Sequence, residues 1–226
     1  MSLKIMILLV FSFSLFNDTY SQTKRIEFTA DETYPEGVTF DAKRNVFYVS
    51  SARKATIGKV DSAGQYTEIL ADSSLKSSYG MKVHGDKLWV CTGDANYSKY
   101  SDSSTYKKMI RLIGIDLLTG QKSDDIDLSA LYAGAHFAND LTFDDKGNIY
   151  ITDSYSPVIY KVQAGKAAVF AQSTWFSSAG VGLNGIVWHP AGFLLVTNNG
   201  NGNLLKVDIS DPARISKVKI NQFFPG

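Results

Sequence analysis

The stretch NDLTFDDKGNIYITD, from Asn139 to Asp153, decides the fold, because looser copies of it occur three more times in the chain. The other copies are PEGVTFDAKRNVFYVSS at 35–51, YGMKVHGDKLWVCTG at 79–93 and NGIVWHPAGFLLVTN at 184–198. Measured between equivalent small or polar residues, the copies follow one another at intervals of about 43, 60 and 45 residues. A period of this length indicates a repeat architecture.

Each copy predicts two strands joined by a tight turn. Apolar and polar residues alternate with a period of two, and turn residues such as Gly, Asn and Asp separate the two runs. A third apolar run follows in every repeat, and a fourth strand is plausible after it. The third strands are expected at 57–60, 112–115, 158–162 and 204–207, the fourth at 66–70, 125–128, 167–170 and 217–220, and a single helical turn at 74–78.

Four antiparallel strands repeated at this period are typical of the blades of a β-propeller. A β-sandwich with Greek-key topology is the rival all-β fold, but it does not predict the same phrase four times. The phrases resemble blades of larger rings, and 223–226 resembles the start of another first strand. We therefore expect four blades of a probable six in a C-terminally truncated chain, with the strand-like segment 25–28 completing the last blade.

The composition is that of a globular domain with little net charge. The 226 residues are 44% hydrophobic and carry a net charge of +1. This length allows one sizeable domain, and the charge gives no electrostatic footprint for nucleic acid or for an anionic membrane. Cys91 is the single cysteine, so we interpret it as an inert core residue.

Residues 1–21 are predicted to be a signal peptide, which leaves 22–226 as the partial propeller domain. Lys4 provides a positive charge, 5–16 are apolar apart from two serines, and small residues precede Gln22. The stretch is shorter than the roughly 20 apolar residues that cross a membrane; an uncleaved anchor or a buried strand is the alternative. We expect a secreted or periplasmic protein with no membrane span in the mature chain.

The propeller fold places the start of every first strand at one mouth of the central channel. In this chain these positions carry Glu36, Tyr79, Asn139 and Asn184. A carboxylate with two amides suits a hard divalent cation, above all calcium, while zinc is possible but usually prefers His or Cys. The alternative is that each side chain only caps a strand or forms an Asx turn.

Other polar residues are expected near this mouth. Asp140 and Asp153 are candidate catalytic bases, although a structural role explains each of them as well. His136 is a candidate substrate contact, whereas His84 and His189 occupy turns at the opposite end of the channel. The long interval in the repeat comes from an insertion at 94–108, which is either a lid or specificity loop or a disordered decoration.

Three motifs resemble the regucalcin/gluconolactonase family, which is also called senescence-marker-protein-like and forms six-bladed propellers. They are YPEGV at 34–38, FANDLTFD at 137–144 with Gly147 after it, and GLNGI at 182–186. The terminal FPG at 224–226 is similar to the segment that leads into an Asp-Gly in the family's next blade.

The resemblance implies roles for individual residues. Glu36 and Asn184 match the family's divalent-metal ligands, and Asn139 matches a residue that lines the substrate pocket. The family's Asp that completes the metal cluster and serves as the base has no counterpart before Gly226. Val38 is a second departure, since many members carry Pro there.

These observations support two functional hypotheses. The first is a metal-dependent, gluconolactonase-like hydrolase of a small-molecule lactone or ester. The second is a non-catalytic extracytoplasmic propeller that binds a ligand or a partner protein. The sequence contains no Gly-x-Ser-x-Gly elbow, P-loop or dinucleotide fingerprint, and the fold alone does not decide between the two hypotheses.

Overall fold

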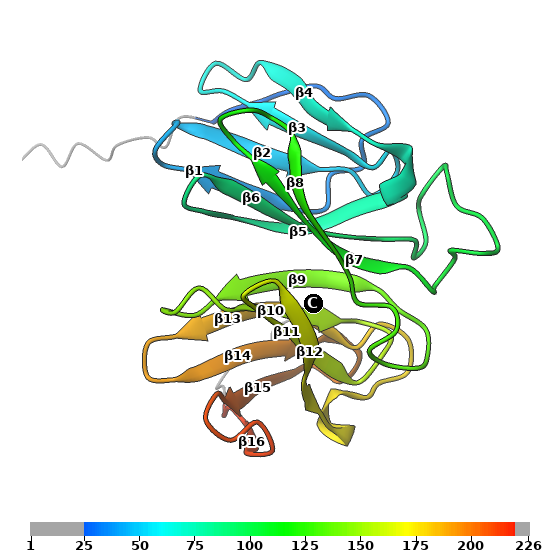
Figure 1. Ribbon diagram of the computed structural model, residues 1–226, viewed down its shortest axis with the longest axis vertical. Coiled ribbons are helices and arrows are strands. Elements are labelled where there is room, and N and C mark those ends of the chain that lie inside the picture. Colours follow the sequence, from blue (N-terminus) through cyan, green and yellow to red (C-terminus); the bar gives the residue numbers. More distant parts are fainter. Residues whose placement is uncertain (1–24, 220–226) are drawn as a thin grey trace, which may run out of the picture.

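The computed structural model describes residues 25–219, which form four antiparallel sheets of four strands each (Figure 1). In every sheet each strand pairs with the next one in the sequence, so the strand order is β1-β2-β3-β4 and its equivalents. We call the sheets blades one to four. This succession of meanders confirms the predicted all-β propeller of about four blades, and it differs from the Greek-key order of the rival sandwich.

The strands are short and follow the repeats of the sequence. Blade one contains β1 (Val38–Asp41), β2 (Val46–Ser50), β3 (Thr56–Val60) and β4 (Tyr66–Ala71), and blade two contains β5 (Ser77–His84), β6 (Lys87–Gly93), β7 (Ile110–Asp116) and β8 (Lys122–Asp127). Blade three contains β9 (Ala138–Phe143), β10 (Ile149–Asp153), β11 (Val158–Gln163) and β12 (Lys166–Gln172), and blade four contains β13 (Leu183–His189), β14 (Phe193–Asn198), β15 (Asn203–Asp208) and β16 (Ile215–Lys217). The described helices are the 3-10 turns η1 (Ser73–Leu75), η2 (Thr174–Phe176) and η3 (Asn199–Asn201).

The hydrophobic core lies between the faces of successive blades. Leu112 of blade two belongs to one buried cluster with Leu141 and Tyr160 of blade three. Similar clusters join blade one to blade two and blade three to blade four. The first strand of each blade is the innermost, because β1, β5, β9 and β13 contact one another in turn. This arrangement brings the starts of the four inner strands together.

Most predicted outer strands form close to their expected positions. Strands β4 and β12 match within two residues, whereas β8 begins three residues early, at Lys122, and β16 ends at Lys217. The turn expected at 74–78 is η1, which ends at Leu75. Asp72 fixes its start, since its carboxylate accepts the N–H of Ser74 at 3.0 Å.

The segment Arg25–Phe28 was expected to be a strand, and that prediction is wrong, because these residues lie outside every described strand. The ring of Phe28 stacks on that of Tyr66 at 6.0 Å, and the backbone of Glu27 lies against Gly64. The segment therefore contacts a turn and a side chain of blade one, and within residues 25–219 its backbone pairs with no strand.

Two other predictions concern residues outside 25–219. The signal peptide at 1–21 and the strand start at 223–226 both lie outside the described residues. Within the described part, no helix has the length and apolar character needed to span a membrane.

Gly80 allows blade two to approach blade three closely. A Cβ atom at this position would lie 2.7 Å from the Cα atom of Asp140 and still closer to the carbonyl oxygen of Asn139. Backbone atoms of a neighbouring strand cannot move aside as a flexible side chain can. Glycine is therefore required where the two inner strands cross.

We expect Gly80→Ala to lower the free energy of unfolding by about 1–3 kcal/mol, the usual cost of overpacking. Gly185→Ala is the matched control at the equivalent position of blade four, where the nearest atom to a new Cβ is Thr197 Oγ1 at 3.6 Å. Urea denaturation of both variants measures the difference. Equal stability of the two variants would contradict the steric argument.

Candidate functional site

The inner strands carry a β-bulge at the same place in three blades. In β9, Asn139 and Asp140 together stand opposite the single residue Thr152 of β10. The same irregularity occurs at 79–80 in β5 and at 184–185 in β13. A bulge redirects the side chains of its two residues, and bulges are common next to active sites. Three of the four predicted mouth positions, at 79, 139 and 184, therefore coincide with these bulges.

Hydroxyl groups on the second strands fix the backbone at the starts of the inner strands. Ser50 Oγ accepts the N–H of Gly37 at 2.7 Å, next to Glu36 in blade one. Thr152 Oγ1 accepts the N–H of Asp140 at 3.2 Å and donates to the carbonyl oxygen of Asn184 at 2.7 Å. This last bond connects the bulge of blade three to that of blade four.

Three of the four predicted mouth residues line one cavity of about 200 Å³, whereas Tyr79 is buried in the core between blades two and three. Four of its lining residues carry a side-chain oxygen: Glu36, Asn139, Asp140 and Asn184. Glycine, apolar residues and a lysine complete the lining. The structure thus brings together both predicted metal ligands, one predicted substrate contact and one of the two candidate bases.

Three of these oxygen-bearing side chains have no protein partner. Within residues 25–219, no hydrogen bond or ion pair engages the side chains of Glu36, Asn139 or Asn184. Asn139 is only 4% exposed, and buried amides are normally hydrogen-bonded. An unpartnered amide beside two carboxylates is suited to bind a ligand or a cation.

The two carboxylates of the cavity affect each other. Glu36 is exposed as a residue, but the protein around its carboxyl group and the charge of Asp140 together raise its pKa to about 7, burial being the larger cause. Burial also raises the pKa of Asp140, while Lys82 opposes this effect. Burial thus disfavours the charged form of both carboxyl groups, and the charge of Asp140 adds to this effect at Glu36.

Lys82 was missed in the sequence. It lines the same cavity, and its Nζ atom lies 3.9 Å from Asp140 Oδ1. The available signal was the mismatch in the repeat, where Thr39, Thr142 and Val187 occupy the corresponding positions of the other first strands. A single cationic residue where the other first strands have threonine or valine indicates a role outside the fold itself.

His136 and Asp153 lie in a buried cluster apart from this cavity. His136 Nδ1 is 2.7 Å from Asp153 Oδ2, which also accepts the hydroxyl of Tyr160 at 3.2 Å. The other carboxylate oxygen accepts the N–H groups of Phe137, Tyr155 and Ser156 at 2.9–3.2 Å. Neither residue lines the cavity at the mouth, and Asp153 is fully buried.

The position of Asp153 recurs in other blades with a similar role. Ser51 and Asn198 occupy it in blades one and four, and both are buried. Each bonds backbone that precedes its own inner strand: Ser51 donates to Thr33, and Asn198 donates to the carbonyl oxygens of η2. The geometry of Asp153 therefore matches a repeated structural contact.

The remaining singled-out side chains lie where the sequence indicated. His84 and His189 are exposed at the ends of β5 and β13, and they stack on Phe143 and Phe193 respectively. Cys91 is fully buried opposite the bulge of β5, where two other blades carry a threonine, and burial raises the pKa of its thiol well above the usual value. A buried thiol of raised pKa is a poor nucleophile.

The insertion between β6 and β7 is held in place by several contacts. Its backbone bonds to Arg53 of blade one and to His136 ahead of blade three. Asp94 Oδ2 accepts the hydroxyls of Ser101 and Thr105 at 2.9 and 2.8 Å, which fixes the loop from inside. These contacts order the insertion against blades one and three, which argues against a disordered decoration; its expected role as a lid or specificity loop stays a prediction.

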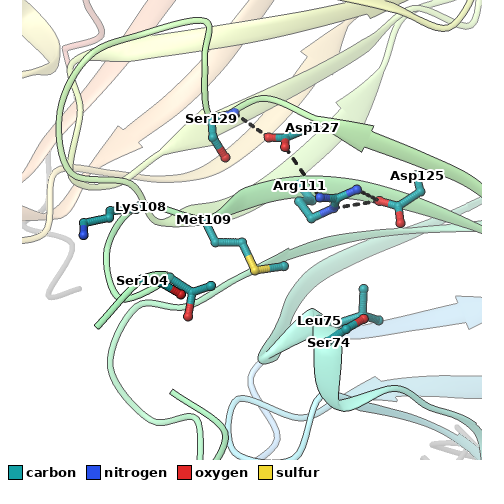
Figure 2. Close-up of a pocket in the computed structure, with 10 residues that line it drawn as sticks. Ser74, Leu75, Ser104, Lys108, Met109, Arg111, Asp125, Asp127 and Ser129 are labelled. Atoms are coloured by element: carbon teal, nitrogen blue, oxygen red, sulfur yellow. Dashed lines mark hydrogen bonds and ion pairs between the residues drawn. The ribbon is translucent and has the colours of Figure 1, made fainter. Parts of the chain in front are cut away.

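A second hollow of about 520 Å³ lies beside this insertion (Figure 2). Its charged groups are already paired, because Arg111 binds Asp125 and Asp127 (Figure 2) and Lys108 donates to the carbonyl oxygen of Ser103. The paired charges leave little to recognise a ligand, so the cavity at the mouth is the stronger candidate.

Comparison with known proteins gives one curated relative and many similar solved structures. No family model matches the chain. Among curated proteins, the core trichothecene cluster protein 14 of Fusarium sporotrichioides is 26% identical over an alignment 221 residues long, which covers 84% of this chain and 56% of that protein. The chain thus spans about half the length of the curated relative it matches.

Solved propellers are similar in structure. A streptogramin B lyase superposes with a TM-score of 0.64 at 12% identity, covering 88% of this chain and 58% of that one. A luciferin-regenerating enzyme gives 0.60 at 15% identity, with 82% and 62% covered. A gluconolactonase from Xanthomonas campestris gives 0.57 at 15% identity, with 82% and 61% covered. The resemblance to gluconolactonase-like propellers is therefore confirmed at the level of the fold.

The raised pKa of Glu36 predicts a specific pH dependence. The folded protein favours the protonated carboxyl group, so stability falls as the pH rises from the ordinary value of 4.5 through about 7. Without divalent ions, Glu36→Gln is expected to melt above the wild type at pH 8 but not at pH 4.5. The exposed Glu68→Gln is the control. A melting difference independent of pH would contradict the assignment.

A structural role for Asp153 predicts that its removal destabilises the fold. Asp153→Ala leaves three buried N–H groups without their acceptor, so we expect a loss of about 2–4 kcal/mol in urea denaturation. Asp145→Ala, at an exposed turn of the same blade, should change stability by less than about 0.5 kcal/mol. An Asp153 variant as stable as the wild type would argue against this role.

Proposed function

We propose that this protein is a divalent-cation-dependent hydrolase of a lactone or ester, with the cation held at the mouth of the propeller channel. The observation that carries the proposal is the cavity at 36, 139, 140 and 184, where oxygen-bearing side chains from three blades converge. Gluconolactonases among the similar structures support the reaction class.

The donor set fits a hard cation. Two carboxylates and two amides match the oxygen ligands of calcium, which takes 6–8 of them with water or substrate completing the shell. The mutual repulsion of Glu36 and Asp140 is a further reason, because a cation between the two would relieve it. Calcium is the first choice, whereas zinc would lack its usual His or Cys ligands among these residues.

Export of the protein would allow a calcium site of low affinity to function. Calcium sites of extracellular modules work with dissociation constants of about 10⁻⁴–10⁻³ M. The expected secreted or periplasmic location is part of the proposal for this reason.

Beyond holding the cation, two of these residues would also act on the substrate in the proposed reaction. A bound cation would supply Lewis acidity at the substrate carbonyl. The free amide of Asn139 would orient the substrate by hydrogen bonds to its oxygen atoms. Asp140 would take the proton from the attacking water, because a general base must lie within reach of the reacting atoms and Asp140 lines the same cavity. Asp153 is not given this role, since its oxygens are occupied inside the protein.

The test combines binding and turnover. After treatment with a chelator, calcium should raise the melting temperature. At a calcium concentration 100 times the dissociation constant, binding adds about 2.7 kcal/mol to the free energy of unfolding. Glu36→Gln should abolish this shift and slow the hydrolysis of a panel of aldonolactones and aryl esters at least about 100-fold, a loss of about 2.7 kcal/mol of transition-state stabilisation. Glu68→Gln, on the outer strand β4, should behave as the wild type.

The outcomes separate the hypotheses. A calcium shift without turnover of any lactone or ester would favour the non-catalytic binding protein. If no divalent ion shifts the melting temperature and Glu36→Gln changes nothing, the proposed site is wrong.

A further inference from the structure

The cavity at the mouth contains a cationic side chain of its own. Lys82 lies on β5, two residues after the bulge, and lines the cavity together with Glu36 and Asp140. Among the described residues it is the one basic side chain in that lining. Its side chain is 42% exposed, so it reaches the carboxylates from the solvent side and can also move away.

The ammonium group of Lys82 is attracted to Asp140 but not fixed there. The distance of 3.9 Å from Nζ to Oδ1 is too long for a hydrogen bond. By contrast, Lys87 on the next strand of the same blade is bound to Asp124 at 2.6 Å. Lys82 thus neutralises part of the negative charge of the cavity while its three N–H donors remain free of any close protein acceptor in the described residues.

The architecture does not require a lysine at this position. The equivalent residues of the other inner strands are Thr39, Thr142 and Val187, and these strands form the same pairs with their second strands. The fold accepts Thr or Val at this strand position. Lysine occupies it only in blade two, where the charge of the side chain faces Asp140. Its presence is explained by the charge of the cavity.

We propose that Lys82 is a built-in competitor of the divalent cation. This inference rests on the proposed function, because the ammonium group and the cation would share the carboxylates of Glu36 and Asp140. Without a divalent ion, Lys82 balances these charges; when the ion binds, the two positive charges repel, and the side chain turns toward solvent. The lysine therefore makes the affinity of the site for the cation lower than the same oxygen ligands would give without it.

Calcium titration calorimetry on the chelator-treated protein tests this competition. Lys82→Met removes the charge with a similar stem, and it should bind calcium at least about ten-fold more tightly than the wild type, or 1.4 kcal/mol. Lys82→Arg keeps the charge and should stay within about three-fold of the wild type. Lys87→Met removes a lysine whose partner lies outside the cavity and should leave the affinity unchanged.

Two further variants keep the result interpretable. Lys82→Thr introduces the residue found in blades one and three, and it replaces Lys82→Met if that variant unfolds at a lower urea concentration. Adding Glu36→Gln to Lys82→Met should abolish the tighter binding, which locates the gain in this cavity.

Each outcome decides the matter. Equal or weaker calcium binding by both uncharged variants would overturn the competition while leaving the proposed function intact. Tighter binding that survives Glu36→Gln would overturn it too, because the gain would come from elsewhere. Absence of calcium binding in the wild type and in every Lys82 variant would overturn both this inference and the proposed site.

Discussion

The site depends on one repeated backbone irregularity, the bulge at the start of the inner strand in blades two, three and four. Two residues there stand opposite one on the second strand. A regular strand would turn successive side chains to opposite faces, and the bulge breaks that rule where Asn139 and Asn184 must face the mouth. The hydroxyls of Ser50 and Thr152 hold the starts of the inner strands, so the second strands define where the site residues of the first strands point.

The packing between blades imposes the complementary constraint. The apolar core lies between sheets, so each blade must approach its neighbour along its whole length. At the crossing of β5 and β9 this approach leaves no room for a Cβ, and Gly80 meets the requirement. The same closeness places Lys82 within 3.9 Å of Asp140, although 58 positions separate them in the sequence.

The sequence predicts the repeat and the residues at the mouth because equivalent positions of a propeller converge. That reasoning locates Glu36, Asn139 and Asn184 correctly around one cavity. It could not separate Asp140 from Asp153, since both belong to the phrase and only the fold shows that the neighbours of Asp153 enclose its carboxylate. Lys82 was missed because its importance comes from a neighbouring blade, and periodicity within one blade contains no such information.

The hydrogen bond from Thr152 to the carbonyl oxygen of Asn184 crosses from one blade to the next. The position of Asn184 therefore depends on how blades three and four sit against each other as well as on the shape of its own blade. A substitution in the core shared by blades three and four would change their relative position and so displace Asn184 at the mouth. The geometry of the mouth is in this way coupled to the packing between blades three and four.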